Sequence, residues 1–266
     1  PQMGQSIIIT IFAVVVIGGM GSIFGAIFSG LMMGLIEGLT KVFYPEASTT
    51  VIFVIMALVL IFRPAGLFGR QTTAHSVADV SSGRAGSILE NGRLWFFVLA
   101  AVGLVLPFMI YPILGMKILC LSIFALAYNI VFGYGGLLAF GHAAFYGSSA
   151  YVAAHAASAW GLPTELCILL GVLTATAIGA LFGWLAIRRS GLYFAMITLA
   201  LAQIIYFYAV QSSWTHGEDG IQSVPRGWLF GVIDLSQQMN MYYVVLAVFL
   251  GAFAFVYRLV HSPFGQ

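Results

Sequence analysis

The chain has 266 residues, of which 61% are hydrophobic and 7% are charged, with a mean hydropathy of +1.04 and a formal net charge of +2. A soluble domain carries roughly 25% charged residues, so this composition excludes a soluble globular protein and predicts that lipid is the main solvent. A net charge this small does not favour nucleic acid as a partner.

Several stretches are apolar enough to be membrane-spanning helices, each of which needs about 20 mostly apolar residues. They lie at 6–20, 24–41, 48–62, 94–112, 116–134, 137–160, 164–187, 192–210 and 241–259. The predicted fold class is therefore all-α, a polytopic membrane protein with about nine spans. Because the chain begins without methionine and stops directly after an apolar run, we expect it to be a window of a longer protein.

A polar stretch separates the first three spans from the other six. Residues 63–93 are rich in Gly, Ser and Thr and lack a sustained apolar period, which is typical of a linker. With alternating spans, the linker side holds seven of the ten basic residues: Arg63, Arg70, Arg84, Arg93, Arg188, Arg189 and Arg258. Since basic residues gather on the cytoplasmic side, the linker is expected in the cytoplasm and the loop 211–240 outside it.

Small residues recur every four positions in two of the spans. One series is Ala26, Gly30, Gly34 and Gly38, and the other is Gly171, Ala175, Gly179 and Gly183. Such spacing places the small residues on one helix face and lets two helix backbones approach closely. The two series predict close helix packing and do not indicate a particular function.

Few side chains in the spans could carry chemistry. Glu37 lies four residues before Lys41, so a surface ion pair explains it. His142 is the ionisable residue that lies well inside a span; it could join helices by hydrogen bonds, with Tyr146 as a partner, or belong to a pathway. Cys120 and Cys167 lie in apolar runs and are expected to be buried, with no metal site or disulfide. We find no HExxH motif, phosphate loop or catalytic triad.

The long loop 211–240 is polar and aromatic. Trp214, Trp228 and Phe230 suit a membrane interface, and GEDGI at 217–221 predicts a turn. This turn could dock a partner or be an ordinary solvated loop, and the residues do not decide between the two.

Several stretches resemble a known family. GGMGSIFGAIFSGLMMGLIEGL (18–39) and LIFRPAGLFGR (60–70) resemble the C-terminal third of the H-type permease subunit of bacterial branched-chain amino acid ABC importers. From residue 94 the chain resembles the M-type subunit, through YNIVFGYGGLLAFGHAAFYGSSAY (128–151), RRSGLYFAMITLALAQI (188–204) and WTHGEDGI (214–221). The last stretch is similar to the pattern W-T-G-G-x-x-G-I, with His216 in place of the first glycine.

The resemblance implies a permease with no enzymatic activity or cofactor of its own, in the bacterial inner membrane. Its expected partners are the remaining permease parts, two cytoplasmic ABC ATPase subunits and a periplasmic amino acid-binding protein. It also implies the division into 1–62 (H-type), 63–93 (cytoplasmic linker) and 94–266 (M-type).

Neutral polar groups could pass an amino acid without trapping it, so we predict that four residues face the pathway or the other permease half: Asn129, His142, Tyr146 and Ser149. The alternatives are urea, short amides or aromatic amino acids as cargo, or a passive channel or secondary carrier. A lipid-modifying enzyme is disfavoured because clustered acids and nucleophiles are scarce.

Overall fold

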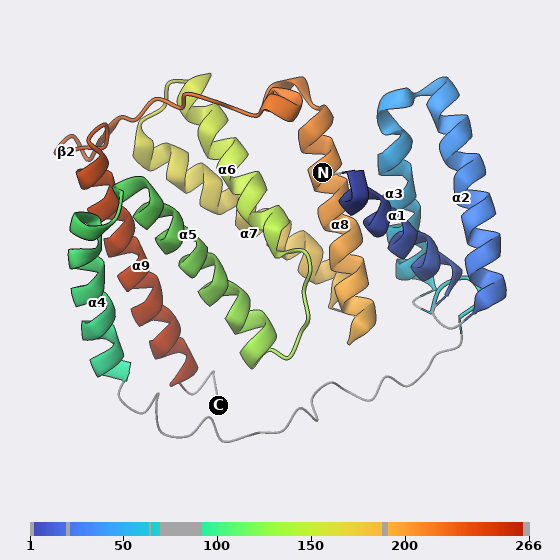
Figure 1. Cartoon of the computed structure of the whole chain (residues 1–266), viewed down its shortest axis with the longest axis horizontal. Coiled ribbons are helices and arrows are strands. Elements are labelled where there is room, and N and C mark those ends of the chain that lie inside the picture. The colour runs from blue at the N-terminus through green and yellow to red at the C-terminus, as the bar shows by residue number, and fades with distance from the viewer. Residues whose placement is uncertain (1–2, 20–21, 64, 70–91, 188–190, 263–266) are drawn as a thin grey trace. The chain divides into compact units, whose positions relative to one another are not determined.

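The computed structural model describes residues 3–19, 22–63, 65–69, 92–187 and 191–262 (Figure 1). Nearly all of the regular structure in these residues is helical. The α-helices are α1 (Met3–Gly18), α2 (Ile23–Phe43), α3 (Ser48–Phe62), α4 (Gly92–Met109), α5 (Pro112–Asn129), α6 (His142–Ser158), α7 (Thr164–Ala186), α8 (Leu192–Gln211) and α9 (Gln238–Val260). Each of the nine predicted spans therefore overlaps a helix, and the predicted all-α class is confirmed.

Shorter elements complete the described chain. A π-helical turn, η3 (Ile130–Tyr134), continues α5, and 3₁₀ turns lie at η1 (Pro45–Ala47), η4 (Ser213–Thr215) and η5 (Gly217–Asp219). The strands β1 (Trp228–Leu229) and β2 (Ile233–Asp234) form an antiparallel hairpin that the sequence did not lead us to expect.

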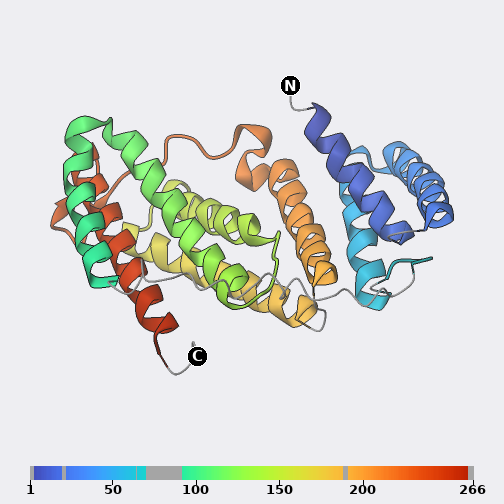
Figure 2. The same cartoon turned by 60° about the horizontal axis from the view of Figure 1, so that its bottom comes forward.

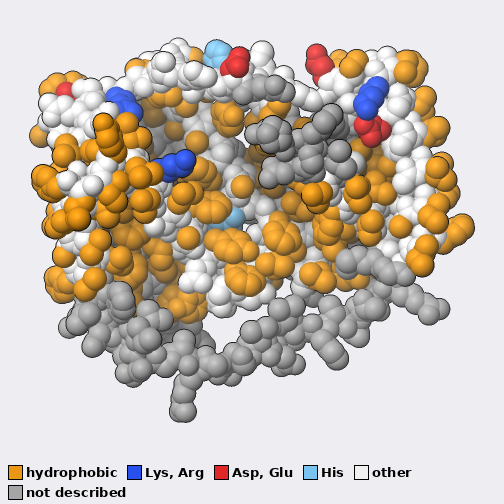
Figure 3. Space-filling view, viewed as in Figure 1, with side chains coloured by type: hydrophobic (Ala, Val, Ile, Leu, Met, Phe, Trp, Pro, Cys, Tyr) orange, Lys and Arg blue, Asp and Glu red, His pale blue; other side chains and the backbone are white. Residues whose placement is uncertain are grey.

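Five of the described helical segments are long and apolar enough to cross a membrane: Ile23–Phe43, Pro112–Tyr134, Thr164–Ala186, Leu192–Gln211 and Gln238–Val260. Shorter apolar helices lie at Ile8–Gly18, Thr50–Phe62 and Phe96–Met109. The segment predicted to span at 137–160 differs, since its helix begins at His142 and is rich in small and polar residues. Hydrophobic side chains cover most of the helix surface that Figure 3 shows, as expected for helices in contact with lipid.

The chain divides into two compact units, and this division differs from the predicted division at the linker 63–93. Unit 1 contains residues 1–76, 137–156 and 169–223, and unit 2 contains residues 77–136, 157–168 and 224–266. The N-terminal helices thus share a unit with parts of the second group of spans. The division at 63–93 stays a prediction, and its residues 64 and 70–91, with Arg70 and Arg84, lie outside the described residues, as do Arg188 and Arg189.

In unit 1, α1 packs against α2 and α3, and α3 packs against α8 (Figure 2). The side chain of Phe53 on α3 stacks on Phe207 of α8 with ring centroids 5.5 Å apart. At the end of α8, the Gln211 side-chain amide donates to the backbone carbonyl of Glu46. Because α8 carries neighbours on several sides, its residues Phe194 to Thr198 are all buried.

Residues 65–69, which the sequence places in the linker, are docked on the end of α1. The amides of Leu67 and Phe68 donate to the carbonyls of Ile17 and Gly18, at 2.9 and 3.0 Å. The Phe68 ring also contacts Phe28 edge-on, with centroids 5.4 Å apart. These bonds satisfy carbonyls at the C-terminal end of α1 that have no partner within the helix.

Glycines make this docking possible. Gly66 has φ +82°, and a Cβ built on it would lie 2.5 Å from Gly19 Cα and 2.7 Å from Val16 O. Gly19 has φ +102° and would meet Gly69 N at 2.2 Å. Both positions therefore need glycine for the backbone conformation as well as for space.

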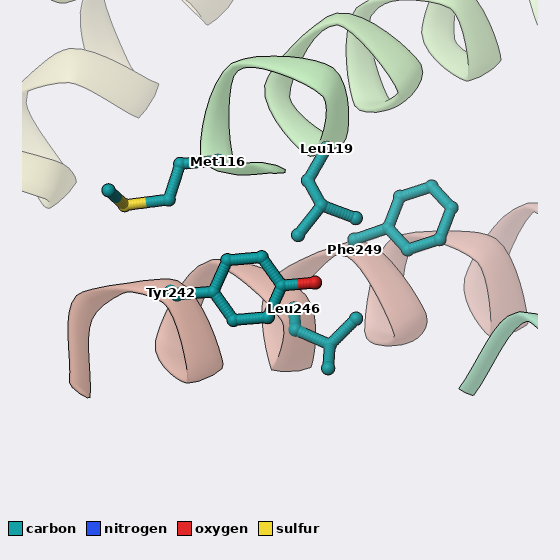
Figure 4. Close-up of a cluster of buried hydrophobic side chains, with 5 residues drawn as sticks. All are labelled: Met116, Leu119, Tyr242, Leu246 and Phe249. Atoms are coloured by element: carbon teal, nitrogen blue, oxygen red, sulfur yellow. The ribbon is translucent and has the colours of Figure 1, made fainter. Parts of the chain in front are cut away.

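The core of unit 2 lies between α5 and α9 (Figure 4). It consists of Met116, Leu119, Tyr242, Leu246 and Phe249. The Tyr242 hydroxyl donates to the carbonyl of Gly103 on α4, with the two oxygens 2.7 Å apart. Since Pro107 has no N–H, the Gly103 carbonyl lacks the amide donor it would otherwise have four residues later. Tyr242 therefore satisfies a carbonyl that Pro107 leaves without its usual helical partner.

Candidate functional site

The helix α5 ends at a π-helical turn, and Asn129 is the last residue before it. The Asn129 side chain is exposed and lies over Gly133, where a Cβ would come within 2.4 Å of the Asn129 Oδ1. Tyr128 stacks on Phe132 across the same turn, with ring centroids 5.7 Å apart. The π-helical turn lies at the C-terminal end of α5, and a pathway role for Asn129 stays a prediction.

The chain between this turn and α6 is irregular, and its last part is held against α8. The amide of Phe140 donates to the Thr198 Oγ1 at 3.1 Å. A Cβ at Gly141 would lie 3.0 Å from the Thr198 carbonyl and 3.1 Å from the Phe182 ring. Non-helical backbone at membrane depth is tolerated where protein buries it or where it lines a water-filled cavity. Here Gly141 is buried against α7 and α8, and the Phe140 amide is bonded to α8, whereas the Phe140 side chain is exposed.

The residue that organises this contact is Thr198, which sequence reasoning missed. Its side chain is 3% exposed, and its hydroxyl both accepts from Phe140 and donates to the carbonyl of Ala195, at 2.8 Å. A signal was present, since Thr198 is the single polar residue in the run FAMITLALA at 194–202. An isolated hydroxyl in an apolar helix often marks a contact between helices.

Three of the four predicted pathway residues lie on α6. His142 is half-buried at the start of the helix, and its ring meets Phe145 edge-on with centroids 5.6 Å apart. Tyr146 is 53% exposed, and the hydroxyl of half-buried Ser149 donates to the Tyr146 carbonyl at 2.9 Å. The structure thus brings His142, Tyr146 and Ser149 onto one helix, whereas Asn129 belongs to unit 2. Their place in a pathway stays a prediction.

The two small-residue series have different surroundings along their length. A Cβ at Gly30 would lie 3.7 Å from Val14, and one at Gly171 would lie 3.1 Å from the Ser149 carbonyl. Apart from adjacent residues and the nearby backbone of the same helix, no described atom lies within 4 Å of the corresponding position at Gly34, Gly38, Gly179 and Gly183. Gly30 and Gly171 therefore lie in helix contacts within this chain, and the packing role of the other four stays a prediction.

Other sequence-based expectations concern charges and cysteines. The predicted pair of Glu37 and Lys41 is confirmed, with Nζ and Oε1 2.7 Å apart. Such a surface pair contributes only a few tenths of a kcal/mol. Cys167 is buried and Cys120 is half-buried, and both thiols are free. Within the described residues, no group of three or more His, Cys, Asp or Glu could hold a metal ion.

The WTHGEDG segment (214–220) folds over the end of α8 and reaches α6. The Trp214 ring stacks on His155, with centroids 5.0 Å apart and 15° between the ring planes. Thr215 is 2% exposed, and its hydroxyl donates to the Ser212 carbonyl at 2.8 Å. Gly217 and Gly220 both have positive φ, which supports the predicted turn.

His216 occupies a backbone conformation that favours glycine. It has φ 63° and ψ 24°, in the left-handed region. A side chain there costs roughly 1 kcal/mol, and the exposed imidazole of His216 offers little burial in return. This geometry gives a physical reason for the glycine in the family pattern that WTHGEDGI resembles.

We expect His216→Gly to raise the free energy of unfolding of the full-length protein by about 1 kcal/mol, because glycine relieves the left-handed strain. His216→Ala is the matched control: it also removes the imidazole but keeps a Cβ, so it should bring no comparable gain. Denaturant titration in detergent measures both. Equal stabilities of the two variants would show that φ at residue 216 is not the cause.

A bundle of apolar helices, with small residues and neutral polar groups in its contacts, defines an integral membrane protein. Residues 113–266 match the family described as the branched-chain amino acid transport system permease component. The chain belongs to this family.

The relatives are permeases as well. The chain is 31% identical over 145 residues to the high-affinity branched-chain amino acid transport system permease protein LivM of Salmonella typhimurium, covering 53% of this chain and 34% of the relative. It is 34% identical over 125 residues to LivM of Escherichia coli strain K12, covering 47% and 27%. The chain thus spans about a third of the length of the first relative and about a quarter of the second. No solved structure matches.

Proposed function

We propose that the chain is a permease component of an ATP-driven ABC importer that moves branched-chain or other hydrophobic amino acids into the cytoplasm. The observation that carries this proposal is the family match over residues 113–266. The scarcity of acidic residues within the helices agrees with it, because a proton-coupled carrier usually needs buried Asp or Glu to hold the proton. Energy for transport is then supplied by other subunits.

The partners follow from this assignment. They are two cytoplasmic ABC ATPase subunits, a periplasmic amino acid-binding protein and the remaining parts of the permease, in the bacterial inner membrane. We place residues 63–93 in the cytoplasm and the loop 211–240 in the periplasm, on the basis of the seven-to-three division of basic residues. Residues 1–62 are assigned to an H-type half and 94–266 to an M-type half; the chain itself is not an enzyme.

The test is uptake of radiolabelled leucine by cells that express the full-length protein with its ATPase subunits and binding protein. Uptake should stop when the ATPase subunits are omitted or when their ATP hydrolysis is inactivated by mutation. Continued uptake without them would instead support a passive channel or a secondary carrier. Competition by unlabelled valine, but not by urea or a short amide, would support the amino acid as cargo.

We expect the double variant Asn129→Ala with His142→Ala to lower uptake on the order of tenfold, the effect of losing about 1.4 kcal/mol of interaction. The reason is that each change removes a neutral polar group from the predicted pathway. Thr176→Ala is the control, because Thr176 is exposed and its hydroxyl donates to its own helix at Val172 O, 2.8 Å away. Unchanged uptake in the double variant, at equal protein level in the membrane, would remove both residues from the pathway.

A further inference from the structure

The β-hairpin in unit 2 has a turn of unusual backbone conformation. Trp228 pairs with Asp234, and Leu229 pairs with Ile233. The turn between them contains Phe230 at φ 51° and Gly231 at φ 68°, and the Val232 amide donates to the Leu229 carbonyl at 3.1 Å. The left-handed conformation of Phe230 is unfavourable for a residue with a side chain, so surrounding contacts must hold it.

Such contacts join the hairpin to the first turns of two long helices. The backbone amide of Phe230 donates to the carboxylate of Glu165, the second residue of α7. On the other side, the Asn240 side-chain amide donates to the Asp234 carbonyl at 3.1 Å, from the first turn of α9. At the base, the Leu235 amide donates to the Gly227 carbonyl at 3.3 Å. The hairpin is thereby fixed at the level where α7 and α9 begin.

The turn presents large apolar side chains that nothing in the described chain covers. Trp228 is 59% exposed, and Phe230 and Val232 are each 78% exposed. Residues 227–233, GWLFGVI, contain no charged residue. Charged residues flank this stretch in the sequence: Arg226 comes directly before it and Asp234 directly after it. Two hydrogen bonds from Ser236 hold the pKa of Asp234 below its usual value, so this carboxylate stays ionised at neutral pH.

We propose that the turn of this hairpin, with Trp228, Phe230 and Val232, inserts into the bilayer at the boundary between headgroups and acyl chains. The position supports lipid as the partner, because α7 and α9 are 23-residue segments apolar enough to span and both begin at the hairpin. The apolar surface continues from the hairpin onto them, through exposed Leu166 and Ile168 of α7 and Met239 of α9. Aromatic side chains are favoured at this boundary.

The charges fit the same partner. Arg226 and the ionised Asp234 both lie at the base of the hairpin, since Trp228 pairs with Asp234 and the Leu235 amide donates to the Gly227 carbonyl. Arg226 is exposed there, where it can meet lipid phosphates, and neither charge lies on the apolar turn. Through its hydrogen bonds to Glu165 and Asn240, the inserted hairpin then holds the first turns of α7 and α9 at one depth in the membrane. This role requires only that the chain is integral to a membrane, so it does not depend on the proposed cargo.

The experiment measures the depth of a nitroxide label in the full-length protein, reconstituted in lipid vesicles with its native cysteines replaced. Single cysteines are introduced by Phe230→Cys and, independently, by Val232→Cys. Gln222→Cys is the control, because Gln222 lies in the same long loop, is exposed and is polar. Electron paramagnetic resonance then compares relaxation by oxygen, which concentrates in the bilayer, with relaxation by a water-soluble nickel chelate.

Labels at 230 and 232 should show an oxygen-to-nickel accessibility ratio several-fold higher than the label at 222. Equal ratios at all three positions would overturn the proposal, as they would place the turn in water. A low ratio at 230 and 232, with label mobility that falls when a purified periplasmic binding protein is added, would identify the turn as a protein-docking surface and would also overturn it. If transport is lost while the oxygen-to-nickel ratio at 230 and 232 stays high, the proposed transport function is in question, and membrane insertion of the turn is still supported.

Discussion

Gly66→Ala is expected to destabilise the full-length protein by about 3 kcal/mol or more. Two costs combine: an alanine at φ +82° is strained by roughly 1–2 kcal/mol, and its Cβ would overlap Gly19 Cα and Val16 O at 2.5 and 2.7 Å, where overpacking typically costs about 1–3 kcal/mol. The displaced segment 65–69 would no longer donate to the end of α1. Thermal unfolding followed by size-exclusion chromatography measures the loss.

Gly251→Ala is the matched control for this prediction. Gly251 lies inside α9, and apart from adjacent residues and the nearby α9 backbone no described atom lies within 4 Å of the position of its Cβ. Alanine is the better helix former by about 0.5–1 kcal/mol, so this variant should be as stable as the parent or slightly more stable. If Gly66→Ala and Gly251→Ala unfold at the same temperature, the docking of 65–69 on α1 does not stabilise the protein.

Tyr242→Phe is expected to cost about 2 kcal/mol, because it leaves the Gly103 carbonyl buried without a donor. The physical reason lies in Pro107, which cannot supply the amide that this carbonyl would normally accept. Pro107→Ala restores that amide, so it should return much of the stability in the Tyr242→Phe background. Equilibrium unfolding of the two single variants and the double variant measures the coupling between the residues.

Tyr243→Phe provides the control for the removal of a hydroxyl from α9. Tyr243 is adjacent in sequence and 36% exposed, and no hydrogen bond of its hydroxyl is found within the described part of the chain. Its loss should change the unfolding free energy by no more than a few tenths of a kcal/mol, as is usual for surface substitutions. Additive effects of Tyr242→Phe and Pro107→Ala would contradict the account, because the two residues act on one carbonyl.

The sequence predicted the spans well because the signal for a membrane helix is local. About 20 apolar residues in a row must form a helix in lipid, since every backbone group needs a partner inside the segment. The same holds for the pair of Glu37 and Lys41, where helical spacing alone brings the charges together. The helix α6 began later than predicted because apolar character continues through the irregular residues 137–141, of which Ala139 and Gly141 are buried.

The glycine contacts could not be predicted from residue spacing along the chain. Spacing marked Gly34 and Gly38 as packing positions, yet their surroundings in this chain are open, whereas Gly103 and Gly115 belong to no such series and lie in close contacts. A Cβ at Gly103 would come 2.5 Å from Leu246, and one at Gly115 would come 2.8 Å from Tyr242. Both contacts join residues more than a hundred positions apart, so no local pattern could indicate them.

By itself, the sequence determined that the chain is an integral membrane protein of mostly helical spans, and its motifs pointed to the permease family that the comparison then established. These properties follow from composition, from helical period and from motifs read along the chain. The tertiary structure decided which polar groups meet: Tyr242 with the Gly103 carbonyl, Thr198 with the Phe140 amide, and Glu165 with the hairpin turn. Each pair joins segments that are far apart in sequence, and in a chain so uniformly apolar many pairings are equally compatible with composition. Only the packing of the helices selects among them.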